Sequence, residues 1–297
     1  MPARSSVILL LLFVCSAGAS SQTGVVEQSD SAAVQKQRAD SIYISLVEDA
    51  EGPEKVLHAE PLYIDLIRDL GARKGEAEWN IAFGLTDRLR YDKYEGLVEY
   101  EWAPVDRLGL EIEVPVTLYS ANSALHYDSI PSNRVESLKL AAQYTFFVSE
   151  KAQSSLAVGY INEFALSDLN IIRNGPFLRS NLYNPFFIAA KRWKNNYHSL
   201  IYAGPKIEQH FVGRKWHTSF AVNTNLHYMI SGTRNFIGVE FNKEFSGNNF
   251  DMHIRPQMRL GISNNLLVGI VTALPVSREN ERLGMFMRLI YEPGHAH

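Results

Sequence analysis

The chain of 297 residues contains one cysteine, Cys15, and it lies in an N-terminal segment that we expect to be removed on export. A mature chain without cysteine has no disulfides, no cysteine nucleophile and no cysteine-ligated metal. Phe13 and Val14 are bulky where a lipid-acylation signal needs small residues. The thiol is therefore expected to carry no function in the mature protein.

Long apolar runs are also missing. The one short run, "VILLLLFV" from Val7 to Val14, follows Arg4 and precedes the small residues "AGA" that end at Ala19. This is the layout of a secretory signal peptide, so we expect cleavage after Ala19. The run is far shorter than the roughly 20 apolar residues that a spanning helix needs, and no comparable run follows. The mature chain should have no transmembrane helix.

A strong charge of one sign is the third absence. The chain has 29 Lys and Arg against 32 Asp and Glu, a formal net charge of −3. Without a basic footprint, nucleic acid is not expected as a partner.

The chain divides into four parts by pattern. After the signal peptide (1–19), residues 20–57 are polar and rich in Ser, Gln and Ala, and we interpret them as a flexible periplasmic leader. Residues 58–76 are predicted as an amphipathic helix and linker, because Pro61 suits a first helical turn, Leu62, Leu66 and Leu70 recur every four residues, and Gly71 suits a C-cap. Residues 77–297 are predicted to form a β-barrel.

Alternation of apolar and polar residues fills that last part. Twelve segments have the length and punctuation of strands, and they cover 77–86, 94–103, 108–118, 136–147, 154–164, 185–194, 198–210, 216–230, 234–244, 250–262, 265–274 and 282–292. Most reach the ~9 to 11 residues that a tilted strand needs to cross a bilayer. An even number suits a barrel with both ends on one side.

The stretch "WHTSFAVNTNLHYMIS", Trp216 to Ser231, has one apolar and one polar face. In a soluble sandwich the apolar face would turn inward, whereas in a membrane barrel it would meet lipid. Connections are short after alternate strands, and two of the others are long, 119–135 and 165–184. Short periplasmic turns opposite longer outer loops are typical of outer-membrane barrels. We therefore expect an all-β fold, a transmembrane antiparallel barrel of about 12 strands with a short N-terminal helix.

All four tryptophans lie at ends of predicted strands. Indole rings prefer the level of the lipid headgroups, so these residues are predicted to form membrane girdles. Trp79, Trp102 and Trp193 would lie on the periplasmic side and Trp216 on the outer side.

The residues that alternate with the lipid face are predicted to line the lumen. They form an acidic wall from the first strands and a mostly basic wall from the last ones, and they are Glu95, Glu99, Glu101, Glu111, Glu113, His217, Asn223, Asn225, Asp251, His253, Arg255, Arg259, Arg282 and Arg288. Facing walls of opposite charge would sort permeants by charge and dipole. Alternatively, the same residues form salt bridges that fill the barrel and stabilise it.

No catalytic or metal site is assigned. His217 and Ser219 have the His-x-Ser spacing of an outer-membrane phospholipase, but alternation turns them into the lumen, and the Asn-Gly that follows the serine in that family is missing. The terminal His295 and His297 lack the further ligands of a metal site. No cofactor is expected.

The block "HAEPLYIDLIRDLGARKGEAEWN", His58 to Asn80, resembles the opening signature of a family of secreted Gram-negative proteins. This resemblance implies an outer-membrane barrel of unassigned role. Members sometimes carry the name phosphoribosylformylglycinamidine synthase. The residues do not support that activity, since it needs a glutamine-hydrolysing cysteine, a nucleotide-phosphate site and a much longer chain.

The expected function is a channel or transporter for small molecules in the outer membrane, with lipids and the barrel-assembly machinery as partners and an unknown permeant. An outer-membrane enzyme of the lipid-hydrolase type and a filled structural barrel are the alternatives. The helix at 61–70 must bury its apolar face. We expect it in or under the periplasmic mouth, with Arg68, Arg73 or Lys74 paired to the acidic wall that begins at Glu76 and Glu78. The alternative is a helix that rests on the outside of the rim or on the membrane surface.

Overall fold

The computed structural model describes residues 25–64, 66–121, 130–167 and 177–294. One helix, α1 (Val25–Glu48), precedes the strands. The strands are β1 (Ala77–Arg88), β2 (Tyr91–Val105), β3 (Leu108–Ala121), β4 (Arg134–Val135), β5 (Ser137–Ser149), β6 (Ser154–Leu166), β7 (Leu178–Trp193), β8 (Tyr197–His210), β9 (Trp216–Met229), β10 (Phe236–Ser246), β11 (Asn249–Ser263), β12 (Leu266–Pro275) and β13 (Leu283–Tyr291). The signal peptide, Asn122, Asn174, His295 and His297 lie outside the described residues.

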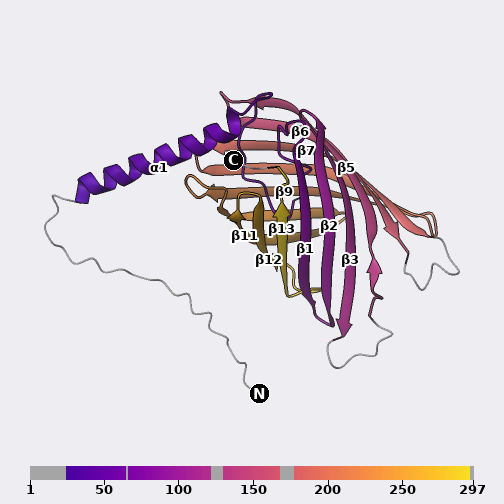
Figure 1. Ribbon diagram of the computed structural model, residues 1–297. Coiled ribbons are helices and arrows are strands. Elements are labelled where there is room, and N and C mark those ends of the chain that lie inside the picture. The colour runs from indigo at the N-terminus through magenta and orange to yellow at the C-terminus, as the bar shows by residue number, and fades with distance from the viewer. Residues whose placement is uncertain (1–24, 65, 122–129, 168–176, 295–297) are drawn as a thin grey trace, which may run out of the picture.

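These strands close into one antiparallel barrel (Figure 1). Each strand pairs with its neighbours in sequence, and β1 pairs with β13 to close the ring. The two-residue β4 pairs with β3 just beyond the β3–β5 ladder, so it extends the line of β5, and the described strands form a ring of twelve. The predicted fold class is therefore confirmed. We call the end where β1 begins and β13 ends the near rim, and the opposite end the far rim.

The predicted strands all exist, and most are longer than expected. Strands β3, β6 and β7 run past the predicted boundaries into the two long connections at the far rim. The remaining parts of those connections, 122–129 and 168–176, lie outside the described residues. Local alternation predicts the middle of a strand better than its end, because ladder pairing with a neighbouring strand decides where a strand stops.

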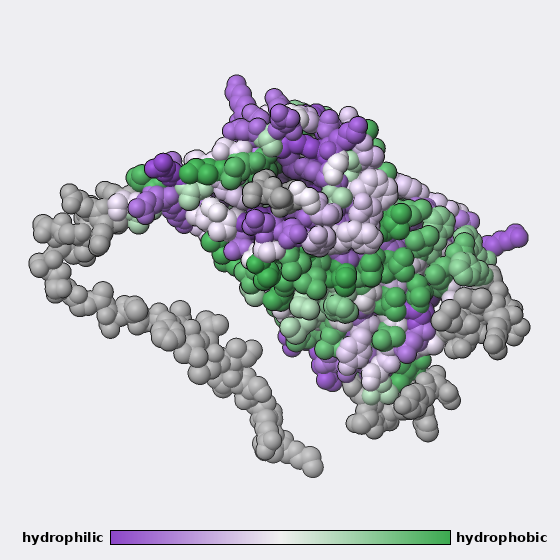
Figure 2. All heavy atoms as spheres, viewed as in Figure 1, coloured by the Kyte–Doolittle hydropathy of each residue, from purple (hydrophilic) through white to green (hydrophobic). Residues whose placement is uncertain are grey.

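The face of the barrel seen in Figure 2 carries an apolar band, drawn in green, between polar zones. Large apolar side chains are exposed on the outside of the barrel, among them Phe83, Val98, Ile201 and Leu226, at 56%, 49%, 50% and 52%. The residues between them point inward and are mostly buried. In the stretch that begins at Trp216 the apolar side faces outward, as the sequence predicts for a barrel surrounded by lipid.

Arginine substitution tests which face meets lipid. Val98 lies at the middle of β2 and points outward, whereas its neighbour Leu97 lines an internal cavity. Val98→Arg should destabilise the inserted barrel by ~2 to 4 kcal/mol, the cost of a cation at the bilayer midplane. Leu97→Arg should be much milder. Urea unfolding in lipid vesicles checks both, and equal costs would mean that the exposed band does not face hydrocarbon.

The helix lies where an irregular leader was expected. Residues 25–48 form α1, which projects from the near rim (Figure 1), and they are rich in Ala, Gln and other residues that tolerate an exposed helix. The helix ends before Gly52 and Pro53, and Arg73 donates to the carbonyl oxygens of Val47 (2.7 Å) and Glu48 (2.8 Å) in its last turn. Among the described helices, none combines the length and apolarity that crossing a membrane requires.

Conversely, the predicted helix at 61–70 is wrong. Residues 54–76, which we call the inner segment, have no regular secondary structure where they are described, and Arg68 has a φ of 61°. The segment is nevertheless largely buried, with Leu62, Ile67 and Leu70 at 2%, 0% and 2% exposure. It runs inside the barrel, in the half next to the near rim.

Candidate functional site in the barrel lumen

The inner segment is held by acceptors that the barrel wall supplies. Glu240 on β10 accepts hydrogen bonds from three consecutive backbone amides, those of Leu62 (3.0 Å), Tyr63 (3.1 Å) and Ile64 (3.2 Å). Gln257 on the neighbouring β11 accepts from Leu62 (2.9 Å) and donates to Glu240 (2.7 Å). A helix would satisfy these amides internally, so wall contacts replace helical bonds here.

Further along, the segment is anchored to the opposite wall. The amide of Ile67 donates to Gln143 (3.3 Å) and that of Gly71 to Thr145 (3.0 Å), both on β5. Glu101 on β2 accepts from the amide of Arg68 at 2.5 Å. Contacts on both walls mean that the segment crosses the lumen.

Arg68 also forms the ion pair that the sequence predicted. Its guanidinium lies 2.8 Å from Glu78, and both side chains are buried. Burial alone would lower the pKa of Arg68, but the carboxylates of Glu78, Glu101 and Glu76 raise it above its ordinary value. Arg73, by contrast, contacts the end of α1. The inner segment therefore places the guanidinium of Arg68 against the acidic wall.

The two charged walls are joined rather than held apart. Arg288 on β13 lies 3.3 Å from Glu99, because β13, β1 and β2 are neighbours in the ring. On the other side, Glu60 of the inner segment lies 2.8 Å from Arg259. These pairs neutralise charge locally, which favours the salt-bridge interpretation over a transverse field.

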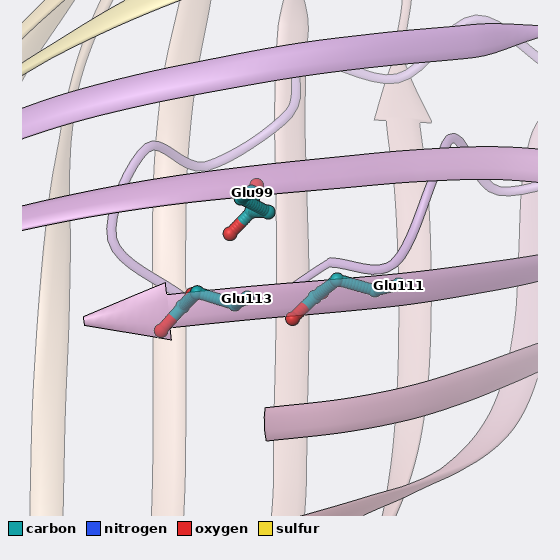
Figure 3. A group of neighbouring side chains, drawn as sticks. All are labelled: Glu99, Glu111 and Glu113. Carbon is teal, nitrogen blue, oxygen red and sulfur yellow. The ribbon is translucent and has the colours of Figure 1, made fainter. Parts of the chain in front are cut away.

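Glu99, Glu111 and Glu113 form a compact carboxylate cluster on β2 and β3 (Figure 3). One oxygen from each lies within 4.8 Å of the others. Lys139 of β5 lies 3.1 Å from Glu111 and 2.7 Å from Glu113, and Arg288 lies near Glu99. Two side-chain cations thus pair with these three carboxylates.

Toward the far rim the lumen opens into a cavity of 680 Å³, which we call the vestibule. Its floor includes Tyr63 and Ile64 of the inner segment. Predicted lumen residues that line it are Glu95, Glu113, Asn223, Asp251, His253, Arg255 and Arg288. Glu99, Glu101, Glu111, Asn225 and Arg259 are buried on the inner face deeper in the barrel.

His217 and Arg282 lie exposed at the far rim, because β9 begins just before His217 and β13 just after Arg282. His217 contacts the hydroxyl of Ser246 (3.0 Å), whereas Ser219 donates to Glu244 (2.7 Å). The histidine and the serine thus have different partners, which gives no support to a catalytic pair.

Trp79, Trp193 and Trp216 are exposed at strand ends, and Trp102 is half-buried against Tyr100.

The lumen is more apolar than predicted. Two clusters pack the inner segment against the wall: Ile64, Ile67 and Leu70 contact β5 to β8, and Leu57 and Leu62 contact β9, β10, β12 and β13. The wall residues there are often small, such as Ala157, and alternation of large apolar side chains does not reveal them. Glu240 was also missed, although it shares the inward parity of Asn242 and Glu244 on its strand.

The wall also has glycines where the segment passes closest. A Cβ at Gly109 would lie 2.1 Å from the carbonyl oxygen of Ile67, and one at Gly269 would lie 2.5 Å from the side chain of Leu62. At Gly109 the obstacle is backbone, so only glycine permits this approach, whereas at Gly269 it is the end of the Leu62 side chain. The barrel wall thus has small residues where the inner segment packs most closely against it.

The HAEPLYID-like family matches residues 54–292. The chain belongs to this family. The residues that give the family its name, His58 to Asp65, lie in the inner segment, so the signature of this HAEPLYID-like protein is the part that contacts Glu240 and Gln257. Asp65 itself lies outside the described residues.

A solved outer-membrane channel has a similar fold. The COG4313 outer membrane channel from Pseudomonas putida F1 is similar at a TM-score of 0.60 with 10% identity, over 77% of this chain and 99% of that chain. The KdgM porin in complex with disordered oligogalacturonate gives 0.49 with 14% identity, over 72% and 98%. Among curated proteins nothing matches this HAEPLYID-like sequence. The fold is that of outer-membrane β-barrels.

Proposed function

We propose that the protein is an outer-membrane channel for small molecules, and that the inner segment closes it at rest. The observation that carries this proposal is a row of cavities through the barrel. The vestibule shares Ile64 and Arg288 with a cavity of 30 Å³, which in turn shares Glu60, Asp69 and Arg259 with a third cavity of 220 Å³ beside α1. A volume of 30 Å³ holds about one water molecule.

The row of three cavities supports a path for solutes through the barrel that is interrupted at one narrow point. Leu66, Arg68, Glu101 and Ile290 surround the smallest cavity. The vestibule is of the size that small-molecule sites usually have, ~300 to 1,000 Å³. Displacing the inner segment by a few ångströms would join the cavities, whereas the closed position blocks any organic solute.

In this proposal the near rim faces the periplasm and the far rim faces outward. The signal peptide at 1–19 directs export, and both ends of the mature chain are periplasmic. Trp79, Trp102 and Trp193 then mark the periplasmic headgroups and Trp216 the outer ones. The predicted lumen residues that line the vestibule meet the permeant first.

Gly109→Ala tests the proposal with one methyl group. The new Cβ collides with the backbone at Ile67, and overpacking of this kind costs ~1 to 3 kcal/mol. The docked position of the inner segment should weaken by about 5- to 150-fold, because 1.4 kcal/mol corresponds to tenfold. Single-channel recording in planar bilayers should therefore show more frequent openings than in the wild type.

Gly96→Ala is the matched control, since a Cβ there comes no closer than 4.0 Å to Ala82. It should conduct as the wild type does. A filled structural barrel makes the opposite prediction for Gly109→Ala: lower thermal stability with no ion current at all.

A further inference from the structure

Arg255 on β11 is a buried arginine with unused hydrogen-bond donors. Its side chain is 6% exposed and lines the vestibule. One terminal nitrogen donates to Asn242 at 2.5 Å, while the buried Nε has no partner in the described part of the chain. The guanidinium lies 3.6 Å from the centre of the Tyr63 ring.

Five of the six other Lys and Arg residues that line the vestibule have carboxylate partners. The pairs are Lys93 with Glu95 (2.5 Å), Arg134 with Glu136 (2.7 Å), Lys139 with Glu113 (2.7 Å), Lys206 with Glu244 (2.9 Å) and Arg288 with Glu99 (3.3 Å). Lys243 donates instead to Thr224 and to backbone carbonyls. Within the described residues, Arg255 has no carboxylate within 4.0 Å. Buried charges normally have a partner, so this one points to an absent ligand.

The nearest carboxylates are engaged elsewhere. Glu240 is the direct cross-strand neighbour of Arg255, but its oxygens accept the amides of the inner segment. Glu281 contacts His253 and lies 3.5 Å from Arg88, and Asp251 lies 3.6 Å from His253. Arg255 therefore lines the vestibule without a carboxylate partner among the described residues.

Beside this guanidinium the floor is aromatic. Tyr63 is 43% exposed, and its ring meets Phe286 edge-on at 5.9 Å. A guanidinium presents a flat fork of donors that matches a carboxylate, and it stacks on aromatic rings. An exposed aromatic edge offers contact to a flat ring of a ligand.

We propose that Arg255 and Tyr63 form a binding site for a small organic anion, a carboxylate attached to a flat ring. The carboxylate lies against the fork of Arg255, and the ring contacts Tyr63 and Phe286. As the class of permeant, this ligand rests on the proposed channel function. Binding itself does not, because the site is complete while the inner segment is docked.

The test uses the full-length protein in detergent and two probes of nearly equal shape, benzoate and benzyl alcohol. Isothermal titration should show that the wild type binds benzoate at least tenfold more tightly than benzyl alcohol. Arg255→Gln should weaken benzoate binding at least tenfold and leave benzyl alcohol unchanged. Lys206→Gln, which removes an ion-paired charge from the same vestibule, should change benzoate affinity less than threefold.

Equal benzoate affinity in the wild type and Arg255→Gln would overturn the proposal, as would a wild type that binds neither probe or does not distinguish them. Gel migration with and without heating confirms that each variant retains a folded barrel. A site that binds benzoate in a barrel that never conducts would leave this inference standing and remove the channel.

Discussion

Glu240→Ala is expected to release the inner segment from the barrel wall. The carboxylate accepts three consecutive amides, and a buried amide without an acceptor costs ~1 to 3 kcal/mol. Leu62 keeps Gln257 as an acceptor, so the amides of Tyr63 and Ile64 lose theirs, which should cost ~2 to 6 kcal/mol in the docked state. Exchange of these two amides with deuterium should accelerate by about 30- to 10⁴-fold.

The control is Glu244→Ala, on the same strand and face but nearer the far rim. Glu244 contacts Lys206 and Ser219 at the vestibule wall, so its loss leaves the inner segment docked. Exchange at residues 62–64 should then remain slow. If Glu240→Ala leaves those amides equally protected, other contacts hold the segment, and the wall carboxylate is dispensable.

Acidification is expected to weaken docking through His58. Burial, with the positive field of Arg192 and the neighbouring His198 and only partial opposition from Asp69, lowers the pKa of His58 from 6.5 to about 3. Its Nε2 lies 2.9 Å from the hydroxyl of Ser155 on β6. A released inner segment would return the imidazole to water and to its ordinary pKa.

The pH dependence of docking follows from the difference in the pKa of His58 between the docked and the released state. The released state binds the extra proton, so the contribution of His58 to docking is complete above pH 6.5 and falls as the pH drops toward 3. The loss approaches ~1.4 kcal/mol per pH unit, or about 3 kcal/mol at pH 4.5. Channel opening frequency should rise between pH 6.5 and 4.5, and His58→Gln should flatten this profile. A profile that stays equally steep in His58→Gln would assign the effect to other groups.

The barrel could be predicted from sequence because its signal is local. In β9, Phe220 and Leu226 alternate with Asn225 and His227, and a period of two survives whatever the strand pairs with. The same argument placed Arg255 and Glu113 on the inner face. Ladder partners and ring closure then follow from neighbouring strands in order.

The inner segment could not be predicted in this way. The spacing of Leu62, Leu66 and Leu70 favours a helix, but the acceptors that replace helical bonds lie far along the chain, 195 residues away for Gln257 and 76 for Gln143. Nothing within residues 58–76 encodes those partners. The prediction that Arg68, Arg73 or Lys74 pairs with the acidic wall holds for Arg68, which pairs with Glu78, because a buried cation is stable only beside an opposite charge.

A barrel that lacks the inner segment should conduct, because nothing then closes its lumen. The variant lacks residues 25–71 and is inserted into planar lipid bilayers beside the full chain, after gel migration with and without heating confirms a folded barrel. Stable open steps are expected in the variant and mostly closed traces in the full chain. Equal conductance from the two proteins would mean that the inner segment does not close the lumen.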